Sequence, residues 1–249
     1  MELFYALPAH IDRSGKRILL DGDEFHHLVR VLRKKTGDRI QVTDGCGLHL
    51  EVLVTAVGKH ELEGDIVAER MMARPHTRVT VALSLLKAPQ RFDFFLEKAT
   101  ELGISRIIPM ITARTVAQPT GERVVKKLVR WRNIMLSAAR QSRRYYLPEI
   151  GEPISFGTVA ALEGFDCRLI PYELSAEPPS SFACTGGKTL FLVGGEGGFT
   201  AEEVIQAKAA GFSEISFGRS ILRAETAAIF AVSLVRARLL EQAEEEDWL

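Results

Sequence analysis

From residue 78 onward, segments typical of buried strands alternate with segments typical of helices. The run from Val79 to Leu86 is almost wholly apolar, and Gln90–Leu102 follows it with apolar residues at helical spacing. Further strands are expected near 104–111, 167–172, 189–193 and 214–217, and further helices near 122–142, 200–210 and 225–241. This alternation predicts an α/β fold with a mostly parallel sheet covered by helices on both faces.

The first 72 residues have a different pattern, in which short alternating strands are separated by turns. Residues 39–43 and 48–54 alternate in polarity on either side of Asp44-Gly45, which indicates a β-hairpin. One helix is expected from about Glu24 to Lys35. The sequence therefore predicts a small β-barrel domain at 1–72 and an α/β domain at 73–249.

The net charge of the whole chain is zero, with 32 basic and 32 acidic side chains, which argues against a protein that coats nucleic acid. The charge is unevenly distributed, however. Residues 1–72 carry 10 basic and 12 acidic side chains, residues 73–148 carry 15 and 4, and residues 149–249 carry 7 and 16. The middle segment, at +11, therefore leaves room for a local nucleic-acid surface.

Simple counts disfavour several kinds of site and location. The three cysteines (Cys46, Cys167 and Cys184) form no CxxC pair, and the six histidines include no HExxH, so we expect neither a disulfide framework nor a metal site. The chain starts without the basic and apolar segments of a signal peptide, and the apolar stretch Ala227–Val235 is too short to span a bilayer. We expect a cytoplasmic protein.

A glycine-rich loop follows the strand expected near 189–193. Gly194, Gly195, Gly197 and Gly198 surround Glu196, and a helix opens at Thr200 with a capping box. A tight strand-to-helix turn needs one or two glycines, so four favour a loop that brings its backbone close to a ligand. Ligands of open α/β sheets bind at the carboxyl ends of the strands, where this loop lies.

Two familiar phosphate-binding motifs do not fit the glycines. A dinucleotide fingerprint requires G-x-G-x-x-G, and no three glycines of this loop have that spacing. A P-loop requires a glycine five residues before Gly187-Lys188-Thr189, but Phe182 occupies that position and Lys188 leads into a strand. Both motifs are rejected.

A second candidate loop runs from Phe217 to Arg223, between a strand and the final helix. Ile221 and Leu222 are unusual in a loop, and Gly218 leaves its backbone open. The two apolar side chains would either clamp a flat ring or fill the core beneath the loop. Sequence alone favours neither.

Five motifs together resemble the RsmE family, the 16S ribosomal RNA (uracil-N3) methyltransferases of the SPOUT superfamily. They keep the family order and cover nearly the whole chain: His26–Arg33, Lys98–Gly103, Gln141–Arg144 with Pro148, Gly194–Phe199 and Ile221–Ala227. One position departs from the pattern, because Gly195 stands where the family usually has proline. The departure implies a less rigid loop.

The resemblance implies a PUA-like β-barrel domain, a SPOUT domain with a C-terminal trefoil knot, and a homodimer. It also implies S-adenosyl-L-methionine as cofactor and ribosomal RNA or the small ribosomal subunit as partner. Carried over to this chain, the cofactor-binding residues are Tyr172, Val193, Gly194, Gly195, Gly197, Gly198, Phe217, Gly218, Ile221, Leu222 and Arg223.

The implied reaction is methyl transfer to N3 of a uridine. N3 lies on the pairing edge and carries a proton, so the base must be unpaired and the proton lost. Arg223 is the candidate for stabilising the resulting anion, with a phosphate contact or a salt bridge to Glu225 as alternatives. Glu196 is the second catalytic candidate, favoured for positioning over acid–base work, with capping of the next helix as its alternative.

A basic surface is expected on the long helix near 122–142 and just after it. Its residues are Arg123, Lys127 and Arg130, which share one helical face, followed by Arg140, Arg143 and Arg144. Only Glu122 offsets eight basic residues between 122 and 144, so RNA phosphate is favoured over a merely solvated face. Arg30 and Arg33, at helical spacing from His26, form a second candidate face.

Two other functions stay open. One is a related SPOUT methyltransferase that acts on another RNA or another atom. The other is a non-catalytic RNA-binding factor in ribosome assembly, although a pure binder has no need of the glycine loop.

Overall fold

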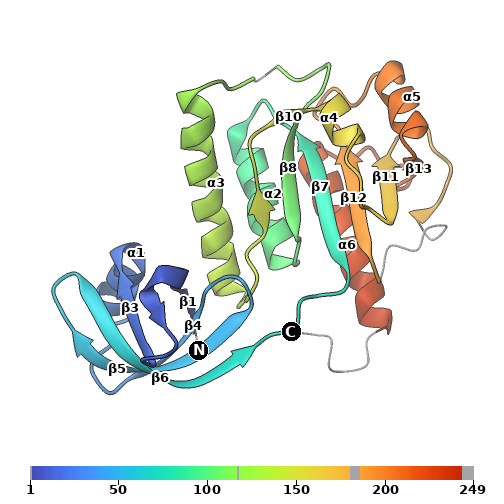
Figure 1. Cartoon of the computed structure of the whole chain (residues 1–249). Helices are drawn as coiled ribbons and strands as arrows, with labels where there is room; N and C mark the ends of the chain where they lie inside the picture. Colours follow the sequence, from blue (N-terminus) through green and yellow to red (C-terminus); the bar gives the residue numbers. More distant parts are fainter. Residues whose placement is uncertain (1, 117, 180–185, 243–249) are drawn as a thin grey trace. The chain divides into compact units, whose positions relative to one another are not determined.

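The computed structural model describes residues 2–116, 118–179 and 186–242, and the chain forms two compact units. Unit 1 comprises residues 1–74 and 139–147, and unit 2 comprises 75–138 and 148–249 (Figure 1). The α/β class is confirmed. The segment 139–147, which the sequence-based boundary placed in the second domain, belongs to unit 1 and is called the return segment below.

Unit 1 is built on a six-stranded curled sheet with the order β1-β4-β5-β6-β3-β2. Its strands are β1 (Leu3–Tyr5), β2 (Ile11–Asp12), β3 (Arg17–Asp21), β4 (Arg39–Thr43), β5 (Leu48–Val57) and β6 (Glu61–Met71), with a short 3-10 helix at Pro8–His10. The expected hairpin is present as the antiparallel pair β4–β5. Two register shifts between β5 and β6 bend the long hairpin, because an unpaired residue increases the local twist.

The helix expected from Glu24 to Lys35 is shorter and less regular than the sequence predicts. Helix α1 (Gly22–Phe25) continues into a π-helical segment, η2 (His26–Val31). The amide of Lys34 donates to the carbonyl of Leu28 at 3.0 Å and closes the helix end, which leaves Arg33 at a φ of +56°. Arg33 therefore does not continue the helical face of His26 and Arg30, and that part of the prediction is wrong.

The return segment is fastened to unit 1 by backbone hydrogen bonds. The amide of Gly47 donates to the carbonyl of Tyr145 at 3.0 Å, and the amide of Leu147 donates to the carbonyl of Gly45 at 2.9 Å. The hydroxyl of Tyr146 donates to the carbonyl of Met72 at 2.9 Å. Gly47 must be glycine here, because its φ is +103° and a Cβ would overlap the Tyr146 ring.

A largely buried ion pair adds to this attachment. Arg140 donates to a carboxylate oxygen of Glu24, and the hydroxyl of Tyr5 donates to the carbonyl of Arg144. Burial raises the pKa of the Glu24 carboxyl, while the charge of Arg140 lowers it. Burial likewise raises the pKa of Tyr5. The other oxygen of Glu24, Oε2, is buried without a hydrogen-bond partner among the described residues.

Unit 2 contains a seven-stranded sheet in which the strands of the described residues pair in parallel. Its strands are β7 (Arg78–Ser84), β8 (Arg106–Ile111), β9 (Glu149–Ile150), β10 (Ile154–Ser155), β11 (Cys167–Pro171), β12 (Lys188–Val193) and β13 (Ser213–Ile215). Six run in the order β10-β8-β7-β12-β11-β13, and β9 pairs with β8. The mostly parallel sheet expected from the sequence is confirmed.

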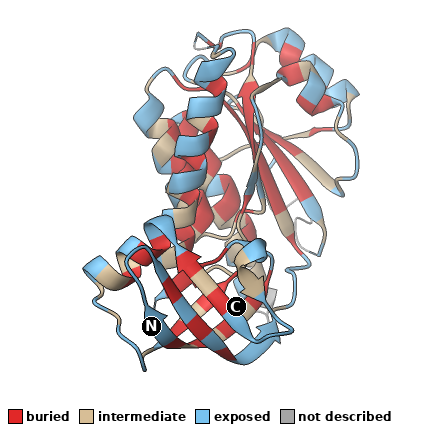
Figure 2. Cartoon of the chain, turned by 60° about the vertical axis from the view of Figure 1, so that its left-hand side comes forward, coloured by how far each residue is buried: buried red, intermediate tan, exposed pale blue. Residues whose placement is uncertain are grey.

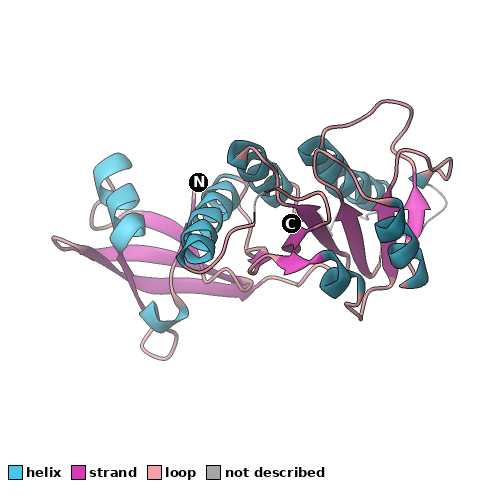
Figure 3. Cartoon of the chain, turned by 90° about the horizontal axis from the view of Figure 1, so that it is seen from above, coloured by secondary structure: helices cyan, strands magenta, loops and turns pink. Residues whose placement is uncertain are grey.

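Helices cover both faces of this sheet (Figure 3). They are α2 (Pro89–Glu101), α3 (Glu122–Gln141), α4 (Phe156–Ala160), α5 (Ala201–Ala209) and α6 (Ala224–Gln242). Along β12, Phe191 and Val193 pack in one core with α2, α3 and α6, while Leu190 and Leu192 pack in another with α4 and α5. The central strands are consequently buried along their length (Figure 2).

We predict that Arg140→Met destabilises the protein by about 3 kcal/mol, because it leaves the buried Glu24 carboxylate without a counter-charge. Burial raises the pKa of Glu24 and the charge of Arg140 lowers it, so removing Arg140 raises that pKa further, and stability is lost as pH rises through it. Thermal unfolding at about pH 5 and pH 8 should therefore show a larger Arg140→Met defect at the higher pH.

The variant Glu24→Gln/Arg140→Met is the control, because it removes the buried charge together with its partner. It should recover most of the lost stability at the higher pH. A double variant as unstable as Arg140→Met would contradict an ionic role for the pair.

Candidate functional site

The glycine loop, Gly194–Gly198, leaves the carboxyl end of β12 where that strand lies beside β7. It closes on itself through a hydrogen bond of 3.0 Å from the amide of Gly198 to the carbonyl of Gly195. Gly198 has a φ of +63°. The chain then enters α5 through the expected capping box of Thr200 and Glu203.

Close neighbours explain why the loop is so rich in glycine. A Cβ on Gly194 would lie 3.0 Å from the backbone carbon of Gly198, and a Cβ on Gly195 would lie 3.2 Å from the Ser84 hydroxyl. That hydroxyl is buried among the hydroxyls of Thr112 and Thr115, at 3.1 and 2.9 Å. Gly195 has no positive φ, so the reason for a glycine here is the lack of space for a side chain beside the Ser84 hydroxyl.

Glu196 does not cap the following helix, because Thr200 and Glu203 do so through their capping box. Its carboxylate instead accepts a hydrogen bond of 3.1 Å from the backbone amide of Lys87, just before α2. The guanidinium of Arg91 lies 3.9 Å from the same oxygen. Glu196 therefore ties the glycine loop to the start of α2, where the helix dipole favours a negative charge.

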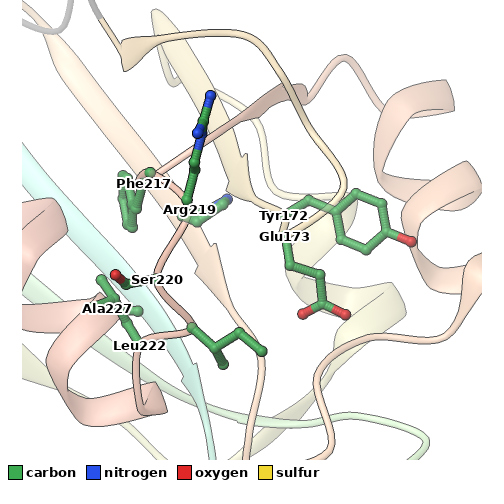
Figure 4. A pocket seen from close by; sticks show the side chains of 10 residues that line it. Tyr172, Glu173, Phe217, Arg219, Ser220, Leu222 and Ala227 are labelled. Carbon is green, nitrogen blue, oxygen red and sulfur yellow. The ribbon is translucent and has the colours of Figure 1, made fainter.

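The second loop, Phe217–Arg223, contributes to a cavity of about 140 Å³ between the segment after β11 and the start of α6. The lining residues are Pro171, Tyr172, Glu173, Phe217, Gly218, Arg219, Ser220, Ile221, Leu222 and Ala227. The Tyr172 ring and the Arg219 guanidinium point in different directions, the first to the right and the second upward in Figure 4. Five of the candidate cofactor residues thus surround one cavity, and the glycine loop is not among its lining residues.

Ile221 does not fill the core beneath the second loop, because 89% of its surface is exposed. Leu222 and Phe217 are half-buried, and Phe217 packs edge-on against Phe230 of α6 with ring centroids 4.9 Å apart. For Ile221 the core-filling alternative is therefore wrong. An exposed apolar side chain at the mouth of a cavity is available to a ligand or to a partner surface.

Arg223 and Glu225 are not paired in the structure. Among the described residues the cation within 4 Å of Glu225 is Arg91, whose Nε lies 3.7 Å from Oε1. Arg223 is exposed, while Glu225 is buried in the first turn of α6. The salt-bridge alternative for Arg223 is wrong, and its guanidinium is accessible from solvent.

The basic residues expected on α3 are divided between the two units. In unit 2, Arg123 is exposed, Lys127 lies over the Trp131 ring at 5.6 Å, and Arg130 forms a 2.7 Å ion pair with Asp93. Arg140, Arg143 and Arg144 belong to unit 1. Of these three, Arg143 is exposed and Arg140 is engaged with Glu24.

Sequence reasoning missed the residues that contact the glycine loop from the segments that follow β7 and β8. Arg114 donates a hydrogen bond to the carbonyl of Gly197, and Lys87 and Arg91 contact Glu196. Lys87 lies in the segment that follows β7, and Arg114 in the one that follows β8. A position just after a strand is a recognisable signal of a site residue. The signal becomes specific only once β7 is known to lie between β8 and β12.

In the described part of the chain, no three His, Cys, Asp or Glu side chains are grouped so that they could hold a metal ion. Within the same residues, no helix is both long enough and apolar enough to cross a membrane.

Comparisons with known families cover both units. A family model described as an RNA methyltransferase domain matches residues 73–236, and one described as an RNA methyltransferase PUA domain matches residues 20–67. The chain is 32% identical over 230 residues to the ribosomal RNA small subunit methyltransferase E of Synechocystis, covering 89% of this chain and 73% of the relative. It is 30% identical over 228 residues to that of Mycobacterium tuberculosis, covering 89% and 87%.

Solved structures of the same architecture include two with a bound ligand. A ribosomal RNA small subunit methyltransferase E from Neisseria gonorrhoeae bound to S-adenosyl methionine gives a TM-score of 0.85 at 29% identity, covering 96% of this chain and 98% of that one. A putative methyltransferase from Legionella pneumophila in complex with SAM gives 0.84 at 25% identity, covering 95% and 96%.

We predict that Gly194→Ala destabilises the protein by about 1–3 kcal/mol, because the added methyl group meets backbone atoms that cannot move aside. Gly197→Ala is the matched control, since its methyl group would lie 3.2 Å from the flexible side chain of Arg114. Thermal unfolding should show the larger loss for Gly194→Ala. Equal losses would mean that the close approach of Gly194 and Gly198 is not what restricts the loop.

Proposed function

This chain belongs to the ribosomal RNA small subunit methyltransferase E family, and we propose that it methylates N3 of a uridine in 16S ribosomal RNA with S-adenosyl-L-methionine as donor. The observation that carries the proposal is the match of both units to the two domains of this family, together with a relative solved with S-adenosyl methionine bound. The glycine loop and the second loop are the proposed cofactor-binding segments.

The cavity beside the second loop suits one part of such a cofactor. Tyr172, Phe217 and Leu222 offer apolar surface, and nothing lies within 4 Å of the position that a Cβ would take on Gly218, so its backbone faces open space. A cavity of about 140 Å³ is smaller than the 300 Å³ or more of a typical ligand pocket. The rest of the cofactor would extend beyond the cavity, and we propose that it extends toward the glycine loop.

The bound cofactor would supply an electrophilic methyl group attached to a positively charged sulfur. The protein must then present an unpaired uracil and favour loss of the proton on N3. The exposed guanidinium of Arg223 is proposed to stabilise the anion that develops on the uracil oxygens. Glu196, which is bonded to the amide of Lys87, is proposed to hold the glycine loop in place rather than to transfer a proton.

The architecture that the family resemblance implies is part of the proposal. It comprises a PUA-like domain at 1–72, a SPOUT domain with a C-terminal trefoil knot at 73–249, and a cytoplasmic homodimer. The apolar residues of α6 are spread around the helix, and Phe230 and Leu240 are 41% and 40% exposed. Helices of that kind are normally covered on every side, which supports a second copy packed against α6.

Each unit is proposed to contribute basic residues to RNA binding. Unit 2 supplies Arg123, Lys127 and Arg130, and unit 1 supplies Arg30, Arg33, Arg143 and Arg144. Arg140 is left out because its side chain is only 22% exposed and pairs with buried Glu24, whereas Arg130, although paired with Asp93, is 63% exposed. RNA bound through these residues would be held mainly by its phosphates, with sequence recognised at the extruded base.

The proposed function is tested by two measurements on the purified chain. Calorimetry with S-adenosyl-L-methionine determines whether the cofactor binds. Methyl transfer from labelled cofactor is then measured on 16S ribosomal RNA and on small subunits, and the modified base is mapped by primer extension, since N3 methylation blocks pairing. Cofactor binding without transfer would favour an assembly factor, and a methyl group at another atom or RNA would favour a related enzyme.

We predict that Arg223→Ala lowers the methyl-transfer rate about 100-fold, because one charged donor to the developing anion is lost. Cofactor and RNA affinities, measured separately, should change far less than the rate. Arg106→Ala, which removes an exposed arginine at the opposite end of the sheet, is the control. An unchanged rate in Arg223→Ala would remove this residue from the mechanism.

We predict that Arg123→Glu and Arg143→Glu each weaken RNA binding and reduce the slope of log affinity against log salt by about 1. Both side chains are exposed, so the fold should persist. Arg106→Glu introduces the same charge change away from the proposed surface. A salt slope that stays the same in all three variants would argue against this RNA surface.

A further inference from the structure

Arg91 lies between two carboxylates, one in the glycine loop and one in the first turn of α6. Its Nη1 is 3.9 Å from Oε1 of Glu196, in the middle of the glycine loop, and its Nε is 3.7 Å from Oε1 of Glu225. Glu225 is the second residue of α6, directly after the second loop. One guanidinium on α2 is thus within ionic distance of the glycine loop and of the first turn of α6, which follows the second loop.

Both distances are too long for hydrogen bonds, so the attraction depends on the charge of Arg91 rather than on the planar geometry of its guanidinium. The hydrogen bond to Glu196 comes instead from the amide of Lys87. A lysine in place of Arg91 should therefore keep most of the attraction, because it keeps the charge and loses only the planar geometry of the guanidinium.

Glu225 makes the charge of Arg91 necessary. Its side chain is only 9% exposed, and its Oε2 is buried without a hydrogen-bond partner in the described part of the chain. A buried carboxylate is costly unless a counter-charge compensates it. Among the described residues, Arg91 is the cation within 4 Å of that carboxylate.

We propose that Arg91 is a positioning residue that couples the glycine loop to the start of α6 and so holds the two cofactor loops in one arrangement. That these loops bind a cofactor rests on the proposed function. The coupling itself is a property of the unliganded chain, because both carboxylates and the guanidinium are its own. Loss of the charge should loosen both loops together, although they are separated by 18 residues or more in the sequence.

Amide hydrogen exchange of the unliganded protein tests the coupling. In Arg91→Met, peptides covering 194–199 and 217–227 should both exchange about tenfold faster than in the wild type. Arg91→Lys should exchange within about twofold of the wild type, because the charge is kept. Arg91→Met/Glu225→Gln should restore protection around 217–227, because the buried charge has been removed with its partner.

Arg106→Met is the control for removing an arginine from unit 2, and it should leave both peptides unchanged. The proposal is overturned if only one loop loosens in Arg91→Met, or if Arg91→Lys behaves like Arg91→Met. Should Arg91→Met not fold, the double variant decides, since recovery of the fold supports the ionic role and failure to recover refutes it.

The cofactor is measured separately. Wild-type protein that binds no S-adenosyl-L-methionine would refute the proposed function, and the exchange experiment would still decide the role of Arg91. Where the wild type binds, affinity should fall about tenfold in Arg91→Met and be kept in Arg91→Lys. Equal affinity in wild type and Arg91→Met would show that the coupling does not serve the cofactor.

Discussion

The pairing of β12 with β7 is the contact on which the rest of unit 2 depends. Six residues of each strand are in register, from Lys188 opposite Arg78 to Val193 opposite Leu83, although more than a hundred residues separate them in the sequence. Because the strands are parallel, their carboxyl ends meet at one edge. Three features therefore come together at that edge: the glycine loop, the segment leading into α2 and the hydroxyls around Ser84. The apolar side chains on the two faces of β12 determine which helices cover each face of the sheet.

Buried carboxylates join distant segments in both units. Among the described residues, three glutamates are buried, namely Glu24, Glu203 and Glu225. Glu24 meets Arg140 across 116 residues, and Glu203 accepts a hydrogen bond from the amide of Ala113 across 90. Such groups add little net stability when paired but are costly when their partner is removed. Their effect is to penalise arrangements in which the joined segments separate, which gives the fold a definite geometry around its loops.

Local patterns in the sequence predict local structure well here. The β4–β5 hairpin and the helix α2 follow directly from residue spacing. The helix expected near 24–35 is present but ends earlier and is less regular, because the chain widens into a π-helical segment, which spacing does not reveal. At the site, the two candidate loops were recognisable from their glycine and apolar residues. The partners of Glu196 and Glu225 were not, because Arg91 reads as an ordinary exposed residue at the start of a helix until the strand order is known.

Because the return segment belongs to unit 1, the residues of that unit are synthesised in two separate stages. All six strands of that unit have been made once residue 74 is complete, yet the backbone partners of Gly45 and Gly47 and the counter-charge of Glu24 are still to come. They arrive only when translation has reached residue 147, roughly 4 to 15 s later at ordinary elongation rates. Until then Gly45 and Gly47 lack these backbone partners, and Glu24 lacks its counter-charge. The N-terminal unit therefore cannot finish folding when its own strands are complete, because it waits for the end of α3 and the residues that follow it.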